Sequence, residues 1–363
     1  MPRLFVGNFD FEHRLGEAHR VLPARLARLN AELATAWLAI ADDGDWVWTP
    51  GEVPQTFWDQ IAAQGLPRLQ PVRDWTQFQS RATFVPWGWT AALIERTRRP
   101  EGSTPAPDPQ VVRQLNSRRW SAEREAAWSI GLDHGATCTS IDDVAAAIAR
   151  LPSGCDAWVM KAEFGMSARE RALGRGLLRD DAVGWARRRL QRDGVIFFEP
   201  WVERIDEVGI LWDVPRSGAP KLVGVAPMLT SEAGHYRGSR FAPVATTGWW
   251  DEAVAVAERA AAEVQRAGYF GPFGIDAMQY CVAGGEIRVR PLQDVNARWT
   301  MGRLALGWRR FFANVPSGAW WHGPASDLAP PQKARMIRTS PDTIDGIPAQ
   351  HLSAIVVQER QAG

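Results

Sequence analysis

The sequence predicts an α/β (α+β) protein with a small N-terminal α/β unit and a larger region of mixed strands and helices. A short apolar strand at 3–6 is followed by apolar residues at helical spacing, such as Leu26, Leu29 and Leu33. The proline-rich segment 98–109 marks a linker, because proline continues neither a helix nor a central strand. Two apolar runs at 274–281 and 286–292 flank Gly284-Gly285, which is typical of an antiparallel hairpin.

The remaining elements are justified by apolar spacing and by turn residues in chain order. We expect strands at 37–40 and 47–48, a helix at 54–63, a helix that follows Asn116-Ser117 and runs to about residue 130, and a helix at 140–150. Further along the chain we expect a strand at 157–161, a helix at 180–192, strands at 195–198 and 222–227, a helix at 252–267 and a last strand at 353–357. We predict four regions from these elements, at 1–108, 109–192, 193–312 and 313–363, and the sequence assigns no role to the last one.

Composition excludes several classes of protein. The chain has 363 residues, of which 45% are hydrophobic and 23% charged, and its formal net charge is +1. Such a balance gives no overall field for binding nucleic acid or an anionic membrane. We find no apolar run of about 18 residues and no signal-peptide pattern, so we expect a cytoplasmic protein that could form oligomers. The three cysteines are scattered, which argues against disulfides and against a zinc site.

The hairpin carries the most informative group of polar residues. Asp294 and Asn296 alternate onto one face of a predicted strand, Arg298 continues that face, and Asp276 lies at the same end of the partner strand. Two carboxylates and an amide oxygen suit Mg²⁺ that also binds polyphosphate. The alternative is a surface Asp beside a turn-forming Asn.

Lysine is rare here, since 42 basic residues include only Lys161, Lys221 and Lys333. Lys161 ends the predicted strand at 157–161 and opens a loop that contains Ser167, Arg169 and Arg171. Backbone amides, a hydroxyl and several cations in one loop can fold over phosphates. The alternative is a solvated basic turn.

Four motifs occur in order along the chain. They are Lys161 at its strand end, Glu199-Pro200-Trp201-Val202 with Asp206 four residues later, Gly274-Ile275-Asp276, and Asp294-Val295-Asn296-Ala297-Arg298. Together they resemble the motifs of the ATP-grasp superfamily of carboxylate-amine ligases. The resemblance covers about residues 110–310, and the N-terminal unit similarly resembles a pre-ATP-grasp domain. It implies two sheet-containing subdomains that sandwich ATP.

The resemblance assigns the phosphate end of the nucleotide to cations and metal ligands. Lys161 would contact the phosphates, and Arg118 stands where a second cation, usually Lys, is expected. Ser167, Arg169 and Arg171 would belong to the loop that covers the phosphates, although this loop lacks the usual glycines. Asp276, Asp294 and Asn296 would hold Mg²⁺, with Asp294 in a place where the family usually has Glu.

The same resemblance assigns the nucleoside end. Glu199 and Val202 would bound the adenine, largely through backbone groups, and Asp206 would bind the ribose hydroxyls. Trp201 lies between the two adenine-binding positions and is either a contact of the cofactor or a core residue.

We therefore expect an ATP- and Mg²⁺-dependent ligase that joins a small-molecule carboxylate, of the amino acid or small peptide class, to an amine through an acylphosphate. Arg298 would hold the carboxylate as a bidentate donor, and Lys161 would assist phosphoryl transfer. The segment 230–240, with Arg237 and Arg240, is a candidate lid. Alternatives are a kinase of the same fold, a nucleotide-binding protein without catalysis, and a tryptophan-rich carbohydrate-binding protein.

Overall fold

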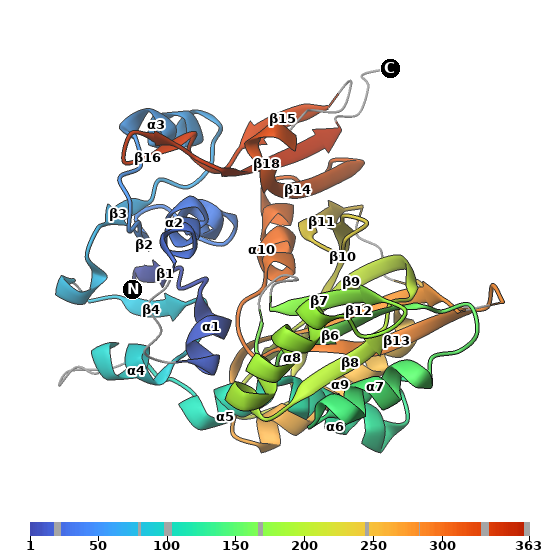
Figure 1. Cartoon of the computed structure of the whole chain (residues 1–363). Helices are drawn as coiled ribbons and strands as arrows, with labels where there is room; N and C mark the ends of the chain where they lie inside the picture. The colour runs from blue at the N-terminus through green and yellow to red at the C-terminus, as the bar shows by residue number, and fades with distance from the viewer. Residues whose placement is uncertain are drawn as a thin grey trace.

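The computed structural model of the chain describes residues 1–17, 23–78, 81–97, 104–165, 170–243, 247–282, 284–327 and 334–358. Three sheets and one short hairpin make up its β structure in these ranges (Figure 1). None of the helices in these ranges has the length and apolar character needed to span a bilayer.

The N-terminal unit is built on a parallel sheet with strand order β3-β2-β1-β4. Its elements are β1 Arg3–Val6, α1 Phe11–Gly16, α2 Ala24–Glu32, η1 Ala34–Ala39, β2 Trp46–Trp48, α3 Gln55–Ala63, β3 Gln70–Val72, η2 Trp75–Gln77, β4 Thr83–Pro86 and α4 Ala91–Thr97. The predicted strand at 37–40 is wrong, because residues 34–39 form the 3₁₀ helix η1. Every residue of η1 is buried, and a short apolar run that is buried on all sides does not distinguish strand from helix.

The second part is an antiparallel sheet of order β5-β8-β6-β7 with helices packed on it. Its elements are α5 Pro109–Leu115, α6 Arg118–Trp128, β5 Ala136–Cys138, α7 Ile141–Ala149, β6 Ala157–Lys161, β7 Arg171–Arg175, α8 Asp180–Asp193 and β8 Ile196–Pro200. Its small core includes Trp158, Met160 and Phe198, so the apolar run before Lys161 is anchored inside the sheet.

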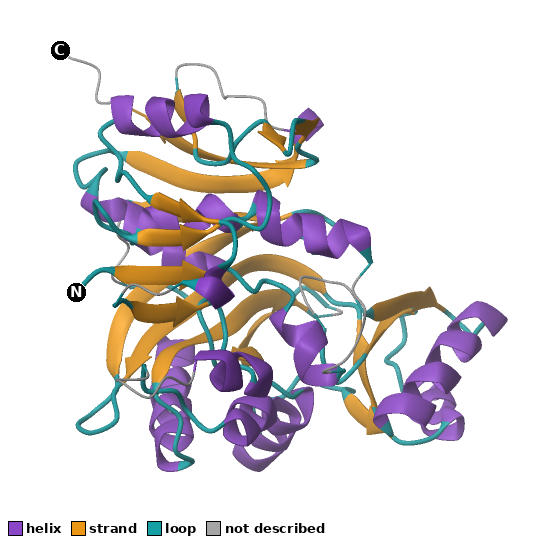
Figure 2. Cartoon of the chain, turned by 90° about the vertical axis from the view of Figure 1, so that its left-hand side faces the viewer, coloured by secondary structure: helices purple, strands orange, loops and turns teal. Residues whose placement is uncertain are grey.

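The third part is an eight-stranded antiparallel sheet of order β13-β12-β9-β10-β11-β14-β18-β15. Its elements are β9 Glu203–Val214, β10 Lys221–Thr230, β11 Tyr236–Ala242, α9 Asp251–Arg266, β12 Gly271–Cys281, β13 Ile287–Asn296, α10 Met301–Gly307, η3 Trp308–Arg310, β14 Ser317–Pro324, η4 Ala325–Asp327, β15 Arg335–Arg338, β16 Thr343–Ile344, β17 Ile347–Pro348 and β18 His351–Gln358. The long strands curve, and helices cover one side of them (Figure 2).

The predicted hairpin is confirmed as β12 and β13, whose register pairs Asp276 with Asp294 and Gly274 with Asn296. Gly284 and Gly285 have φ values of 109° and 86°, a region that favours glycine, so the turn needs these residues. The register shifts between Met278 and Asp276, so the turn and this irregularity together set the pairing that brings the two carboxylates side by side.

The segment after residue 313 continues the large sheet through β14, β18 and β15. It also contacts the N-terminal unit, since the Thr35 hydroxyl donates to the Thr339 carbonyl at 2.7 Å. One hydrophobic core runs through both parts and includes Phe5, Trp37, Trp308 and Trp320. The four region boundaries remain a prediction, but the last segment now has a structural place.

Candidate active site

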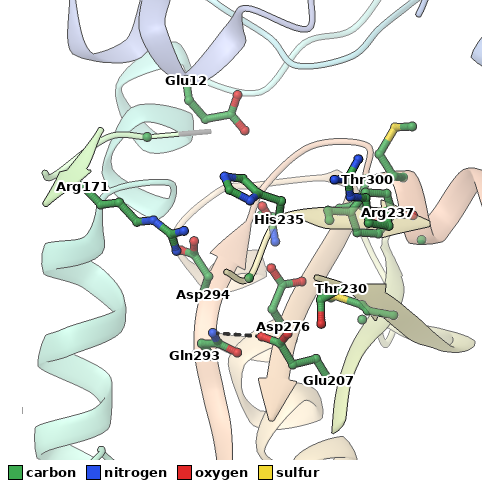
Figure 3. A pocket seen from close by; sticks show the side chains of 18 of the residues that line it. Glu12, Arg171, Glu207, Thr230, His235, Arg237, Asp276, Gln293, Asp294 and Thr300 are labelled. Atoms are coloured by element: carbon green, nitrogen blue, oxygen red, sulfur yellow. Dashed lines mark hydrogen bonds between the residues drawn. The ribbon is translucent and has the colours of Figure 1, made fainter. Parts of the chain in front are cut away.

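A cavity of about 620 Å³ lies where the three parts meet. Glu12 reaches it from the N-terminal unit, Lys161 and Glu199 from the second part, and Asp276 and Asp294 from the large sheet. Figure 3 shows Glu12, Asp276 and Asp294 pointing toward this common space. Residues distant in sequence are thus gathered around one cavity.

The candidate metal ligands lie together on the hairpin. Asp276 on β12 faces its cross-strand partner Asp294 on β13, and Asn296 also lines the cavity. Burial raises the pKa of Asp276 to about 7, and the negative charge of Asp294 adds to this rise. A cation beside the two carboxylates would relieve their repulsion. The described residues contain no cluster of three or more His, Cys, Asp or Glu suited to a metal, so other oxygens would have to complete such a site.

Arg118 links this cluster to the strand of Lys161. Its guanidinium forms an ion pair with Asp294 at 3.2 Å and donates to the Ala162 carbonyl at 2.8 Å. Ser117 caps α6 by accepting from the Arg119 amide, and its hydroxyl donates to Glu163 at 2.6 Å. The start of α6 is therefore fixed so that Arg118 projects between the two sheets.

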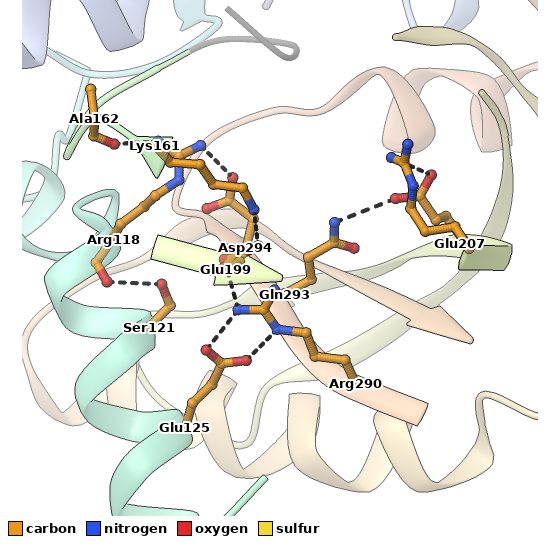
Figure 4. Close-up of polar contacts among 11 residues, drawn as sticks. Arg118, Ser121, Glu125, Lys161, Ala162, Glu199, Glu207, Arg290, Gln293 and Asp294 are labelled. Carbon is orange, nitrogen blue, oxygen red and sulfur yellow. Dashed lines mark hydrogen bonds and ion pairs between the residues drawn. The ribbon is translucent and has the colours of Figure 1, made fainter. Parts of the chain in front are cut away.

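Four charged side chains form a buried chain that begins at the cavity with Lys161 and Glu199 and continues outside it with Arg290 and Glu125. The Lys161 ammonium contacts Glu199 at 2.6 Å, and Arg290 contacts Glu199 at 3.1 Å and Glu125 at 2.6 Å (Figure 4). Burial alone would raise the pKa of Glu199, but the charges of Arg290 and Lys161 outweigh it and hold that pKa well below its usual value. Burial raises the pKa of Glu125 because a single close cation, Arg290, does not offset the desolvation.

Burial also lowers the pKa of Lys161, and the charge of Glu199 only partly opposes this shift. No motif in the sequence points to Glu125, and alternation along the strand is compatible with Arg290 either at the site or over the sheet edge. Alternation along the strand gave the face of Arg290, but the contact with Glu125 joins residues 165 positions apart and has no local signal.

One end of the cavity is an apolar slot with cations at its rim. Val202 packs with Leu132 and Met278, and all three line the cavity. The Trp201 ring lies against two guanidiniums, with its centroid 5.4 Å from Arg171 and 4.6 Å from Arg204. Trp201 therefore lies at the cavity rather than inside a core.

The structure does not bring Asp206 into this cavity. Its carboxylate accepts a hydrogen bond from the Trp249 indole at 3.1 Å. Glu207 is among the described residues that line the cavity, and Asp206 is not. Neighbouring residues of a strand point to opposite faces of the sheet, so Asp206 and Glu207 lie on different sides of β9. Glu207 accepts from Gln293 at 3.4 Å (Figure 3). Following the alternation of β9 backward from its buried residues could have identified it.

Arg298 lines the cavity among residues of the N-terminal unit. It forms an ion pair with Glu12, lies over the Trp87 ring at 5.3 Å and donates to the Trp299 carbonyl at 2.8 Å. Burial raises the pKa of Glu12, although Arg298 opposes this shift. No pattern in the sequence pointed to Glu12, because its role depends on how the N-terminal unit docks.

The predicted phosphate loop is described only in part. Ser167 and Arg169 lie outside the described residues, whereas Arg171 begins β7 and donates to the Ala233 carbonyl. The predicted lid at 230–240 is largely strand, because β10 ends at Thr230 and β11 begins at Tyr236. Arg237 forms an ion pair with Asp327 at 3.1 Å, and the turn between the strands lines the cavity through Gly234 and His235.

The three parts, with the cavity between the two antiparallel sheets, have the arrangement of the ATP-grasp fold, and the predicted fold is confirmed. The chain is similar to N5-carboxyaminoimidazole ribonucleotide synthetase from Thermus thermophilus, with 15% identity, a TM-score of 0.55 and coverage of 99% of this chain and 94% of that one. It is also similar to N5-carboxyaminoimidazole synthetase from Staphylococcus aureus in complex with ADP, with 9% identity, a TM-score of 0.55 and coverage of 91% and 92%.

A third similar structure is the biotin carboxylase domain of 2-oxoglutarate carboxylase from Hydrogenobacter thermophilus, in complex with MgADP, ADP and bicarbonate. It shares 11% identity and has a TM-score of 0.53, with coverage of 98% of this chain and 86% of that one. No family model and no curated protein sequence matches the chain.

Proposed function

We propose that the protein is an ATP-dependent ligase that activates a carboxylate as an acylphosphate and joins it to an amine. The observation that carries this proposal is the convergence of Lys161, Arg118 and the Asp276–Asp294 pair on one cavity with an apolar slot. Similar structures hold ADP in one case and MgADP with bicarbonate in another, which supports a nucleotide at this place.

The residues at the cavity fit ATP and Mg²⁺. The slot at Val202 and Met278 suits a flat apolar base, and Glu207 rather than Asp206 is the acid available for ribose hydroxyls. Lys161 and Arg118 would bind the phosphates as cations. The raised pKa of Asp276 reflects in part a repulsion between carboxylates that a divalent cation would relieve.

Asp276, Asp294 and Asn296 would hold Mg²⁺, which when bound neutralises charge on the phosphates. Arg118 now pairs with Asp294, and it could turn from that carboxylate to a phosphate when nucleotide and metal arrive. Once Arg118 has turned to the phosphate, the carboxylate of Asp294 would be free to bind the metal.

The chemistry runs in two steps. A carboxylate oxygen of the substrate attacks the γ-phosphorus of ATP, so the bond to ADP breaks and an acylphosphate forms. The neutral amine then attacks the acyl carbon, phosphate leaves with the bonding electrons, and the nitrogen loses a proton. Arg298 would hold the carboxylate and then the oxyanion, because its fork of donors matches both.

The test is product analysis with purified protein, ATP, Mg²⁺ and a panel of acids and amines. We expect ADP, phosphate and an amide product that all require both substrates, and we expect the product to be lost in Asp276→Asn. Asp156→Asn is the matched control, since Asp156 is an exposed acid paired with Arg175 away from the cavity. A stable phosphorylated product without an amine would identify a kinase instead, and ATP binding without ADP formation would contradict catalysis.

A further inference from the structure

The N-terminal unit supplies one wall of the cavity, and this wall has an unusual composition. It consists of Phe9, Glu12, Leu29, Leu33 and Trp87, which we call the N-terminal wall. Four of its side chains are apolar and one is a carboxylate. Phe9 and Trp87 pack with ring centroids 4.8 Å apart, and the Asn30 side chain on α2 donates to Asp10 at 2.9 Å. Packing and hydrogen bonding therefore hold the N-terminal wall in place.

Glu12 and Arg298 have hydrogen-bonding groups that their ion pair leaves unused. Glu12 is 5% exposed, and apart from that ion pair neither of its carboxylate oxygens has a hydrogen-bond partner on another described residue. The Nε of Arg298 is likewise buried, and it has no hydrogen-bond partner among the residues that the structure describes. A buried acceptor and a buried donor therefore lie side by side at the edge of the cavity, and such groups are normally satisfied.

A ligand that satisfies both groups offers a donor to Glu12 and an acceptor to Arg298, and a donor cation beside an acceptor anion also matches the charges of the two side chains. An ammonium offers three donors and no acceptor, and a carboxylate offers only acceptors. The zwitterion of an α-amino acid carries the two groups one carbon apart. The carbon body of such a ligand would then meet Leu29 and Leu33, which are partly exposed on the N-terminal wall.

We infer that this compartment binds an unphosphorylated α-amino acid with an apolar side chain, its ammonium on Glu12 and its carboxylate on Arg298. This inference rests on the proposed function and names the substrate class for the same site. A phosphorylated acceptor does not suit the N-terminal wall, because none of its five side chains is a cation. A dicarboxylic amino acid would place its extra charge against the side chains of Leu29 and Leu33, which is unfavourable.

The experiment is calorimetric titration of the whole protein with ADP and Mg²⁺ present. The ligands are leucine of either hand, 4-methylpentanoate, which lacks the ammonium, leucinamide, which lacks the carboxylate, and glycine, which lacks the side chain. We expect leucine to bind. Each truncated ligand should bind at least about tenfold more weakly, which is the usual effect of losing a charged hydrogen bond or a buried side chain. Equal binding of leucine and 4-methylpentanoate would overturn the inference.

Glu12→Gln separates recognition from a purely structural role. If Glu12 binds the ammonium, the ratio of leucine to 4-methylpentanoate affinity falls toward one in this variant. If Glu12 only holds Arg298 in place, both affinities fall together and their ratio stays unchanged, which contradicts the inference. Glu123→Gln is the control, since Glu123 is an exposed acid on α6 outside the cavity.

Leu33→Ala gives a second readout that does not depend on Glu12, and it should lower the ratio of leucine to glycine affinity. Failure of the inference and failure of the proposed function give different results. ADP formation with other acids, but no leucine binding, overturns only the inference. Leucine binding without ADP formation for any pair of substrates overturns only the ligase activity.

Discussion

Replacing Arg290 should destabilise the protein far more than replacing an exposed arginine. Its side chain is 5% exposed and contacts Glu125 and Glu199, which are 10% and 13% exposed. Arg290→Met removes the cation, and Lys161, which contacts Glu199, is then the remaining cation in this chain of four charges. Breaking a buried ion network by removing one partner costs about 3–5 kcal/mol, a large share of the roughly 5–15 kcal/mol that stabilises a native protein.

The assay is chemical denaturation of the wild type and of Arg290→Met at pH 7. Arg288→Met is the matched control, because Arg288 lies two residues earlier on the same strand and pairs with Glu286 and Asp133 at the surface. Exposed pairs contribute little, so the control should unfold close to the wild type. If both variants unfold at the same denaturant concentration, the buried chain of charges has no special importance and the reasoning fails.

The same chain of charges predicts a dependence on pH. The pKa of Glu199 is lowered in the folded protein, so its contribution to stability is present above the unfolded pKa of about 4.3 and is lost as pH falls toward the folded value. In Arg290→Met one of the two cations that lower this pKa is absent. The acid-dependent loss of stability that Glu199 causes should therefore be smaller in the variant, as denaturation at pH 3 and pH 6 would reveal; an unchanged loss would speak against this role.

Three other results are expected. Lys161→Met should weaken ATP binding by about tenfold or more in a nucleotide titration, and unchanged affinity would remove Lys161 from the phosphate site. Glu207→Gln should weaken nucleotide binding more than Asp206→Asn does, because only Glu207 lines the cavity; the reverse order would restore Asp206 as the ribose acid. Gly174→Ala should lower the unfolding temperature, since its Cβ would lie 2.1 Å from the Trp158 ring, and overpacking costs about 1–3 kcal/mol; an unchanged temperature would show that the ring can shift.

Local patterns were sufficient where a site depends on residues close in sequence. Alternation along a strand and a Gly-Gly turn predicted that Asp276 and Asp294 would lie at the same end of the hairpin, and the register of β12 and β13 makes them direct cross-strand partners. The order of the four motifs was sufficient for the fold. Lys161 at the end of a buried strand was also recognisable from its apolar neighbours.

Local patterns failed where packing between distant segments decides. Glu12 and Arg298 are brought together only by docking of the N-terminal unit, and Glu125 meets Arg290 only across a helix and a strand. Asp206 and Glu207 are adjacent acids, so the choice between them depended on the face of β9 that is turned to the cavity. The role of the last segment required the order of strands in the sheet, which no repeat or motif encodes.

The position of β18 in the sheet constrains the order in which the protein can fold during its synthesis. This strand is inserted between β14 and β15, and through His351 and Leu352 it contributes to the cavity. A growing polypeptide that has not reached His351–Gln358 leaves two neighbouring strands without their shared partner. We therefore expect that ribosome-bound intermediates keep an open sheet edge and that the substrate compartment closes only after this strand has emerged from the ribosome.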